Sequence, residues 1–582
     1  MKHPSERLRS RASRTEGLHP QPKDEATHRI HSLFRLRMLA SGCEAERASP
    51  QGQLPQPKDE ATHRIHSLFR LRKDVRRADL ALVLGLTLAV GALSPWFPGI
   101  GSGNEQSRIY LTEALLVDGT VAIDGAMARH GQTGDKSVRA GRHYSDKAPG
   151  TSLVALPAVA LYRAMVATPT LAGQLRAARI AASVLPTLLL LWVLLGWLRE
   201  VVDGGTARAL VVACALGSLG TTYGTLLFGH QLAAVCVLLA FLSTRRLRAG
   251  PVGAPLGAPV QAAAVSAGFF AGLAVLTEYT TVLYMLPIGV AFVWWSRRRP
   301  ALVALALAGA ALPIATLLLY HQAAFGHPLR TGYDFLVNPY FAGLHTAGWR
   351  GFGWPRFERL GVHFLSPRKG LFFYAPWLVL AVPGVWALWR GRAKSGVPGT
   401  PGAPTPGDTP VVLGVVLISV LALLAMPNDH GGWTLGQRYL TGAVPWLAWL
   451  VAAALGRWPR LRPVFVAGVL VALVLTGLAT AVFPFYPEHG QHPTMQFGLV
   501  FARAGVDGGS LWQVLGLGSL LGASLVAGAA ALGLVWWLRR WGSVAVALGL
   551  AAGLLWGVAR MRPDPGPVGL RDRILERILP AP

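Results

Sequence analysis

Apolar stretches of about 16 to 25 residues recur along the whole chain, and each is close to the length that crosses a hydrocarbon layer of ~30 Å. Charged residues make up only 14% of the 582 positions, against roughly 25% in an average soluble domain. The sequence therefore predicts an all-α polytopic membrane protein with about 13 transmembrane helices. The expected spans lie near residues 80–97, 178–198, 207–223, 227–243, 261–277, 281–296, 301–320, 371–389, 411–426, 439–456, 463–482, 511–537 and 541–558.

The formal charge of +27 comes largely from short clusters of arginine between these stretches, such as Arg245, Arg246 and Arg248. Lysine and arginine in short loops mark the cytoplasmic side of a membrane protein. The basic composition is therefore explained without nucleic acid, and we expect no nucleic-acid partner. The charge pattern predicts a multi-pass membrane protein whose basic loops face the cytoplasm.

The two ends of the chain differ from its apolar body. The sequence PQPKDEATHRIHSLFRLR occurs twice without substitution, at 20–37 and at 55–72, and has no apolar run long enough for a signal peptide or a core. We expect residues 1–77 to be a basic, disordered cytoplasmic N-terminus, residues 78–560 to be the transmembrane domain, and residues 561–582 to be an amphipathic tail.

Two long loops, 98–150 and 321–370, fall on the side opposite the arginine clusters and are expected to carry short interfacial helices. The stretch 152–169 is read as re-entrant or interfacial, because a complete crossing would place the later basic clusters outside. Most acidic residues after position 79 then lie in outer loops, together with histidines and aromatic residues. This concentration predicts that the functional site faces the periplasm or exterior.

The first outer loop holds two groups of candidate residues. In GNEQSR, Glu105 and Arg108 lie three apart on a short helix expected on the membrane surface. In GRHYSDKAPG, Lys147 is expected at headgroup level, where its ammonium could bind a lipid phosphate. Asp146 could hold a divalent cation or orient the lysine, and Tyr144 could stack on a sugar or bond a phosphate oxygen.

Further candidates lie at the outer ends of later spans. His230 in LLFGH could line a polar pocket between helices. Arg368 precedes an aromatic helix start and could face lipid headgroups. Arg438 and Tyr439 follow the glycines of GGWTLGQRYL, and the Arg438 guanidinium offers two parallel donors to a phosphate. No Walker sequence, zinc-site spacing or Rossmann fingerprint occurs in the sequence.

The order of these motifs resembles that of the bacterial GT-C membrane glycosyltransferases, which include aminoarabinose transferases, rhizobial galacturonosyltransferases and relatives of protein mannosyltransferases. The resemblance runs from about residue 78 to about 560. It rests on NEQSR, the G-x-x-Y-S-x-K-x-P-G stretch, LLFGH, AAFGHPL, KGLFFYAPW and GGWTLGQRYL.

The resemblance implies transfer of a sugar from a polyprenyl-phosphate carrier to an acceptor hydroxyl on a glycan, lipid or protein. It implies that a carboxylate of the first outer loop activates the acceptor, supported by Arg108, and that Lys147 binds the carrier phosphate. The usual aspartate at the start of the first motif is Asn104 here, so either Glu105, Asp135 or Asp146 supplies the catalytic carboxylate or the activity is altered. A divalent cation at Asp146 is a further expectation.

Two other readings stay open from the sequence. A transporter or flippase of a lipid-linked or small polar substrate would carry ionisable residues near the bilayer midplane. A membrane glycan ligase or polymerase would keep the same basic outer loops and transfer an oligosaccharide.

Overall fold

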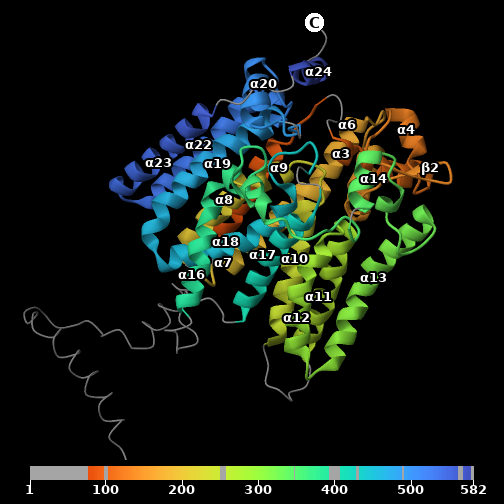
Figure 1. Ribbon diagram of the computed structural model, residues 1–582, viewed down its shortest axis with the longest axis horizontal. Coiled ribbons are helices and arrows are strands. Elements are labelled where there is room, and N and C mark those ends of the chain that lie inside the picture. The colour runs from red at the N-terminus through yellow and green to blue at the C-terminus, as the bar shows by residue number, and fades with distance from the viewer. Residues whose placement is uncertain are drawn as a thin grey trace, which may run out of the picture. The chain divides into compact units, whose positions relative to one another are not determined.

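The computed structural model describes residues 76–97, 102–248, 257–346, 348–391, 407–427, 431–487, 490–561 and 568–578. These residues belong to one compact unit, Asp74–Pro582. Helices dominate it, and most run side by side (Figure 1). The expectation of a disordered, duplicated N-terminus falls almost wholly outside the described residues.

Among the described residues, eight helices are long and apolar enough to cross a membrane, so the expected count of thirteen is not confirmed. The protein is a multi-pass membrane protein of mainly helical structure. The eight are Leu171–Leu198 (α6, η2 and α7), Ala258–Thr277 (α11), Pro300–Phe325 (α13), Asp408–Ala425 (α17), Arg438–Arg457 (η8 and α18), Pro459–Val482 (η9 and α19), Ser519–Leu538 (α22) and Trp541–Arg560 (α23).

The other expected spans are helical but short or interrupted. The stretch 371–389 divides into α15 (Leu371–Tyr374), η7 (Pro376–Leu380) and α16 (Ala381–Gly391). The break falls at Pro376, which has no backbone N–H for a continuous helix. The remaining ones are helix 76–92, α8 (Gly204–Leu216), α9 (Leu219–Tyr223), α10 (His230–Arg245) and α12 (Thr281–Ser296).

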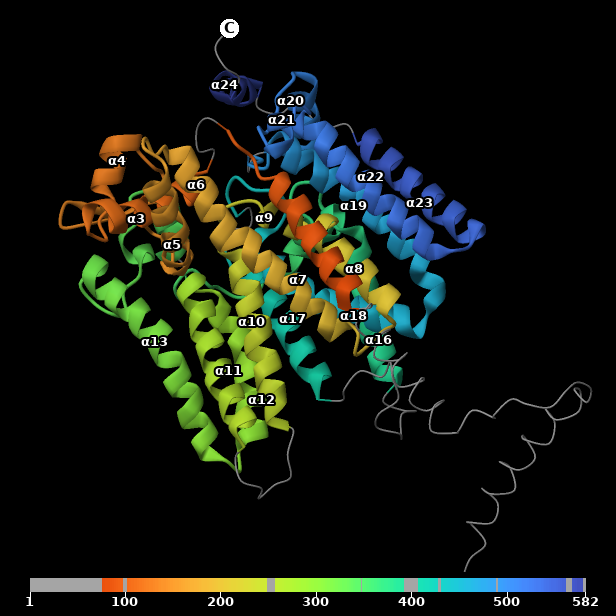
Figure 2. The same ribbon diagram turned by 180° about the vertical axis from the view of Figure 1, so that it is seen from behind.

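Helices α11 and α13 lie against each other along their length (Figure 2). A Cβ atom at Gly268 would lie 1.8 Å from the Ala306 carbonyl oxygen, and one at Gly309 would lie 2.1 Å from that of Val265. Glycine therefore permits the close backbone approach typical of helix pairs in membranes.

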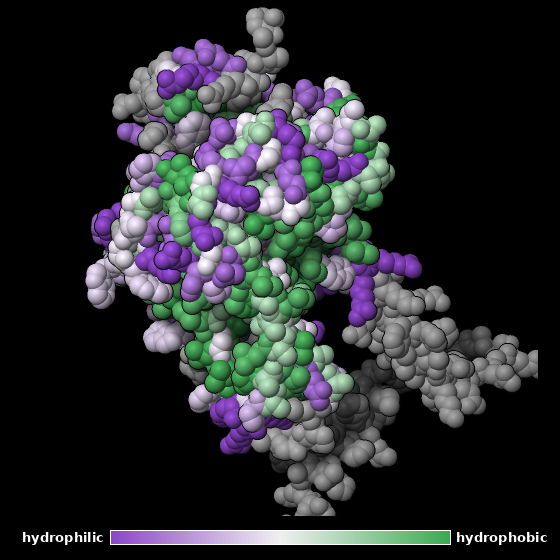
Figure 3. Space-filling model, turned by 90° about the vertical axis from the view of Figure 1, so that its right-hand side faces the viewer, coloured by the Kyte–Doolittle hydropathy of each residue, from purple (hydrophilic) through white to green (hydrophobic). Residues whose placement is uncertain are grey.

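Helices α10 and α17 are antiparallel, because the C-terminal end of α10 lies next to the N-terminal end of α17. Arg245 Nε at the end of α10 lies 3.1 Å from Asp408 Oδ2 at the start of α17, and Arg248 also binds Asp408. His230 and Ala425, at the other ends of these helices, therefore share the opposite end of the molecule. Polar residues gather at the two ends and apolar residues between them (Figure 3).

The first outer loop folds into α3 (Gly103–Glu113), η1 (Ala114–Asp118), α4 (Asp124–His130) and the antiparallel strands β1 (Ser137–Arg139) and β2 (Arg142–Tyr144), followed by α5 (Gly150–Met165). Ala140 and Gly141 have positive φ angles of 49° and 76°, as the tight turn of a two-residue hairpin requires. The all-α prediction missed this hairpin.

Helix α3 is enclosed by protein, so its prediction as a surface helix is wrong. Nine of its eleven residues are buried, Glu105, Ser107 and Arg108 among them, and α5 and α6 pack against it.

The second outer loop contains η4 (Gly332–Phe335), α14 (Pro339–Thr346), η5 (Phe357–Arg359) and η6 (Gly361–Leu365). It contacts the first outer loop directly, because Ser137 Oγ donates to the Gly332 carbonyl at 2.6 Å. A Cβ atom at Gly332 would lie 2.6 Å from Asp146 Cα. The two loops are thus joined next to the candidate residues.

Candidate functional site

Lys147 is the centre of the candidate site. It lies in the turn between β2 and α5, and its Nζ is 2.9 Å from Asp135 Oδ2 and 2.8 Å from Asp146 Oδ2. Its side chain is 13% exposed, so it is enclosed by protein and not extended along lipid as expected. One ammonium is therefore shared by two carboxylates.

The two carboxylates differ in how many of their oxygens are hydrogen-bonded. Both oxygens of Asp146 are used, because Oδ2 binds Lys147 and Oδ1 accepts from Ser107 Oγ at 3.2 Å. Among the described residues, Asp135 Oδ1 has no hydrogen-bond donor. The Asp135 side chain is also the more exposed, 25% against 5% for Asp146. Asp135 is thus the carboxylate that a ligand can reach.

The pKa values of Asp135 and Asp146 are shifted in opposite directions. Burial and the Asp135 carboxylate raise the pKa of Asp146, against the pull of Lys147. Burial alone would also raise the pKa of Asp135, but the Lys147 ammonium holds that pKa below its ordinary value. Burial opposes the charge of Lys147, yet the two carboxylates raise its pKa. Of the two carboxyl groups, Asp135 is therefore the one that more readily stays ionised beside Lys147.

Arg108 lies on α3, next to Ser107. Its Nη2 is 2.6 Å from Glu278 Oε1, and its Nε donates to Asn104 Oδ1 at 3.0 Å. Asn104 therefore orients the arginine, a role its amide oxygen can fill without a negative charge. Burial would raise the pKa of Glu278, but Arg108 and His230 hold it below the ordinary value.

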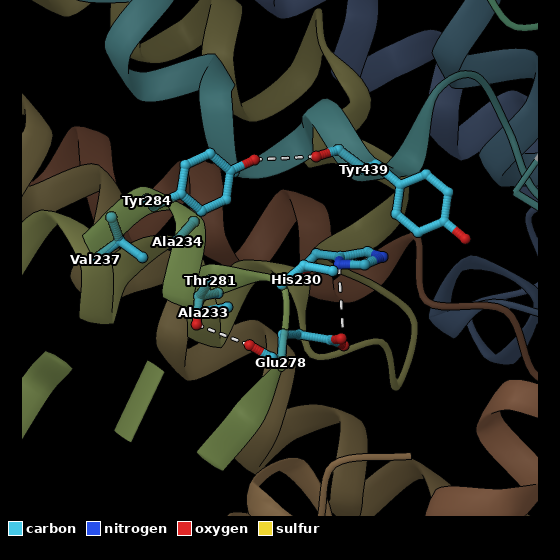
Figure 4. A pocket seen from close by; sticks show the side chains of 10 residues that line it. His230, Ala233, Ala234, Val237, Glu278, Thr281, Tyr284 and Tyr439 are labelled. Carbon is cyan, nitrogen blue, oxygen red and sulfur yellow. Dashed lines mark hydrogen bonds and ion pairs between the residues drawn. The ribbon is translucent and has the colours of Figure 1, made fainter. Parts of the chain in front are cut away.

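Glu278 also lines a small cavity of about 20 Å³. The cavity lies between the start of α10, the α11–α12 turn and η8 (Arg438–Ala443) (Figure 4). His230 Nδ1 lies 4.0 Å from Glu278 Oε1, and His230 Nε2 is buried with no hydrogen-bond partner among the residues that the structure describes. His230 thus lines this cavity, with Tyr284 and Tyr439 on the opposite wall.

Arg438 joins the same group of charges. Its guanidinium lies 5.0 Å from the centre of the Tyr439 ring, and its Nη2 donates to Tyr439 Oη at 3.3 Å. Within the part of the chain that the structure describes, its Nε is buried without a hydrogen-bond partner. The charge of Arg438 helps to lower the pKa of both Asp135 and Glu278. Arg108, Lys147 and Arg438 therefore surround one set of carboxylates and leave donor capacity free.

Glu105 lies outside this group. Its two oxygens accept from Arg179 Nε and Nη2, each at 2.8 Å, and Oε1 also accepts from the backbone N–H of Leu227 at 2.6 Å. The Glu105 side chain is fully buried. Its carboxylate is thus fully occupied by contacts that tie α3 to α6 and to the turn before α10.

Two other predicted residues have different surroundings. Tyr144 is buried in an apolar cluster, and its ring meets Phe325 edge-on at 5.9 Å. Arg368 is half-buried, with its backbone N–H bonded to Ser366 Oγ at 3.1 Å. The adjacent Lys369 is buried, and its Nζ donates to the Thr434 carbonyl at 2.7 Å.

Sequence reasoning missed an aromatic wall beside Lys147. Tyr333 in η4 stacks on His345 of α14, with ring centres 4.1 Å apart and planes 7° apart, and Tyr279 meets its edge at 5.8 Å. Burial raises the pKa of Tyr333, while the Lys147 charge lowers it. The GYD that follows AAFGHPLRT was the available signal, because Gly332 next to an aromatic residue permits a close approach.

The candidate residues do not form a metal-binding set. The Lys147 ammonium lies between Asp135 and Asp146, where a cation would have to bind. Within the described ranges, no three histidine, cysteine or acidic side chains gather as metal ligands. The expected cation at Asp146 therefore does not fit this arrangement.

Comparison with known proteins gives similarities of fold. No family model and no curated protein sequence matches the chain. ArnT from Cupriavidus metallidurans in the apo state is 16% identical, with 81% of this chain and 76% of that chain covered and a TM-score of 0.46. The same protein bound to undecaprenyl phosphate is 15% identical, with coverage of 81% and 77% and a TM-score of 0.44.

Arabinosyltransferase EmbB from Mycobacterium smegmatis is 13% identical, with 92% of this chain and 46% of that chain covered and a TM-score of 0.42. These structures are GT-C glycosyltransferases, the group that the sequence motifs resemble. At such identities and TM-scores they assign no residue roles, and the proposals below rest on the site residues.

Proposed function

We propose that the protein transfers a sugar from a polyprenyl-phosphate carrier to an acceptor hydroxyl at the outer face of the bacterial cytoplasmic membrane. The observation that supports this most is the shared ammonium of Lys147, with Arg108 and Arg438 around the same carboxylates. A membrane enzyme that uses a lipid-linked donor must bind a phosphate at the end of its helices, and this cluster lies there.

The phosphate is the leaving group of the reaction. As the bond between the anomeric carbon and the phosphate oxygen breaks, negative charge grows on that oxygen and must be stabilised. Lys147 and Arg438 supply this charge stabilisation, and the unpartnered Nε of Arg438 is a donor for it. Arg108 positions Glu278, and the Tyr333 hydroxyl beside Lys147 donates to the same phosphate.

The acceptor hydroxyl needs a base. Geometry favours Asp135, because its Oδ1 is free and its side chain is the more accessible, whereas both oxygens of Asp146 and of Glu105 are occupied. The acceptor oxygen forms a bond to the anomeric carbon, its proton passes to Asp135 Oδ1, and the carrier phosphate leaves with the electron pair. Asp146 positions Lys147.

The test is transfer by purified full-length protein from polyprenyl-phosphate sugars to glycolipid acceptors. Lys147→Ala should lower kcat/KM about 10²- to 10³-fold, because one donor to the leaving group is lost. Lys136→Ala is the matched control, since the side chain of this half-exposed lysine of the same loop bonds, among the described residues, only to Gln132 and Met127. Equal rates for the two variants would contradict the assignment.

The same assay separates the other two readings. Uptake of substrate into vesicles without a covalent product would establish a transporter. Addition of an oligosaccharide in one step would establish a ligase or polymerase.

A further inference from the structure

The second outer loop carries an exposed aromatic segment, residues 349–365, that plays no part in the site above. Five large apolar side chains in it are more than a third exposed, and two are among the most exposed tryptophans of the described residues. Their exposed fractions are 75% for Trp349, 91% for Trp354, 61% for Phe357, 39% for Leu360 and 67% for Leu365.

A tight turn holds the first part of this segment. The backbone N–H groups of Trp349 and Phe352 each bond to the other's carbonyl, at 2.9 and 3.0 Å. Arg350 and Gly351 between them have positive φ angles of 51° and 82°, which define a two-residue hairpin turn. The exposed Trp349 therefore projects from a fixed backbone and not from a loose loop.

The segment is tied to the end of a membrane helix. The backbone N–H of Gly353 donates to the Ala425 carbonyl at 2.8 Å, and that of Arg356 donates to the Leu424 carbonyl at 3.0 Å. Arg359 Nη1 donates to the Met426 carbonyl at 2.9 Å. These carbonyls are the free ones at the C-terminus of α17, so Trp354 lies within a few residues of the level where α17 leaves the apolar layer.

That level belongs to the same face as the candidate site. The C-terminal end of α17 lies at the same end of the molecule as His230, because the opposite ends of α10 and α17 are joined through Asp408. Tryptophan and arginine at such a level are the residues that anchor proteins at the boundary between headgroups and acyl chains.

We propose that residues 349–365 insert into the outer leaflet, with the side chains of Trp349, Trp354 and Phe357 at the boundary between headgroups and acyl chains and those of Arg350 and Arg356 on anionic headgroups. The segment carries Arg350, Arg356 and Arg359 against the single acid Glu358, so its charge complements an anionic leaflet. Insertion to a depth of ~5–10 Å would cover all of the exposed rings.

The segment leads directly into Arg368 and Lys369, and Lys369 holds the loop that precedes Arg438. Anchoring in the leaflet therefore sets the height of this part of the site relative to lipid phosphates. The proposal stands on the position of the segment and does not depend on sugar transfer.

The test is the depth of a nitroxide label in the full chain, reconstituted into vesicles of phosphatidylcholine and phosphatidylglycerol. The label is placed at Trp354→Cys or Phe357→Cys in a Cys43→Ser background, where Cys214 and Cys236 are buried and unreactive. Arg142→Cys, exposed at the β1–β2 turn of the other outer loop, is the matched control.

We expect the labels at 354 and 357 to be relaxed several-fold more by oxygen relative to a water-soluble nickel chelate than the label at 142. The ratio should rise with the phosphatidylglycerol fraction, and Arg350→Gln with Arg356→Gln should remove that rise. Labels at 354 and 357 as accessible to nickel as the label at 142 would overturn the insertion. A ratio that is independent of phosphatidylglycerol would overturn the role of the two arginines.

Discussion

Two buried ion clusters lie beside helix α3 and differ in whether their carboxylate oxygens are all hydrogen-bonded. In one, Glu105 and Arg179 form a bidentate pair whose carboxylate is fully occupied. In the other, Lys147 is shared by Asp135 and Asp146, and among the described residues Asp135 Oδ1 has no donor. A closed pair stabilises the fold, whereas an incomplete cluster can accept a ligand and a proton.

The largest expected effect is on catalysis. Asp135→Asn removes the base and should lower kcat about 10²- to 10⁴-fold, with a smaller change in KM. The rate of sugar transfer measures this. Asp124→Asn is the control, because Asp124 is a half-exposed carboxylate of the same loop that pairs with His143. An equal loss of transfer rate in both variants would contradict the role of Asp135 as the base, and with it the difference between the two clusters.

Breaking the Glu105–Arg179 pair should lower the stability of the fold. Arg179→Met leaves the buried Glu105 without its cation and should lower the free energy of unfolding by about 3–5 kcal/mol. Thermal unfolding of the detergent-solubilised protein is the measurement. A double change to leucine at both positions should recover much of the loss, because no unpaired charge remains. A wild-type unfolding curve for Arg179→Met would show that the pair is not structural.

Removing the Tyr333 hydroxyl from the aromatic wall should have an effect of intermediate size. Tyr333→Phe keeps the stack on His345 and removes one donor to a charged oxygen, so KM for the donor should rise about tenfold to a hundredfold. The unfolding midpoint should stay unchanged. Tyr340→Phe, on the neighbouring helix α14, is the control. A change in kcat alone would place the hydroxyl elsewhere in the reaction.

The smallest effect is a pH dependence of stability. Because the pKa of Asp146 is raised in the folded protein, the fold takes up a proton before the unfolded chain does, so its contribution to the unfolding free energy rises as pH falls through that pKa. The pKa of Asp135 is lowered, so its contribution is lost only at lower pH, as pH falls through its folded value.

The unfolding midpoint as a function of pH should therefore show a rise that is missing in Asp146→Asn. An unchanged profile in the variant would assign that titration to another group.

The membrane character and the contact between Asp146 and Lys147 could be predicted from the sequence, because apolar length and closeness along the chain are local properties. Glu105 could not be placed in this way, since its partner Arg179 is 74 residues away and only packing of α3 on α6 brings the two together. The hairpin at residues 137–144 was missed because its strands are only three residues long.

The count of thirteen spans is not confirmed, for a related reason. Hydropathy measures the apolar content of 371–389 but not the interruption at Pro376. Asp429, one of the acidic residues after position 79 expected in the outer loops, lies outside the described residues.

Gly332 leaves no room for even a methyl group above the backbone of Asp146. The length of chain between the end of α13 and Gly332 therefore helps to set the position of the Asp146 carboxylate. An insertion between Gly326 and Thr331 would have to be matched by one in the hairpin, so the two outer loops can change in length only together.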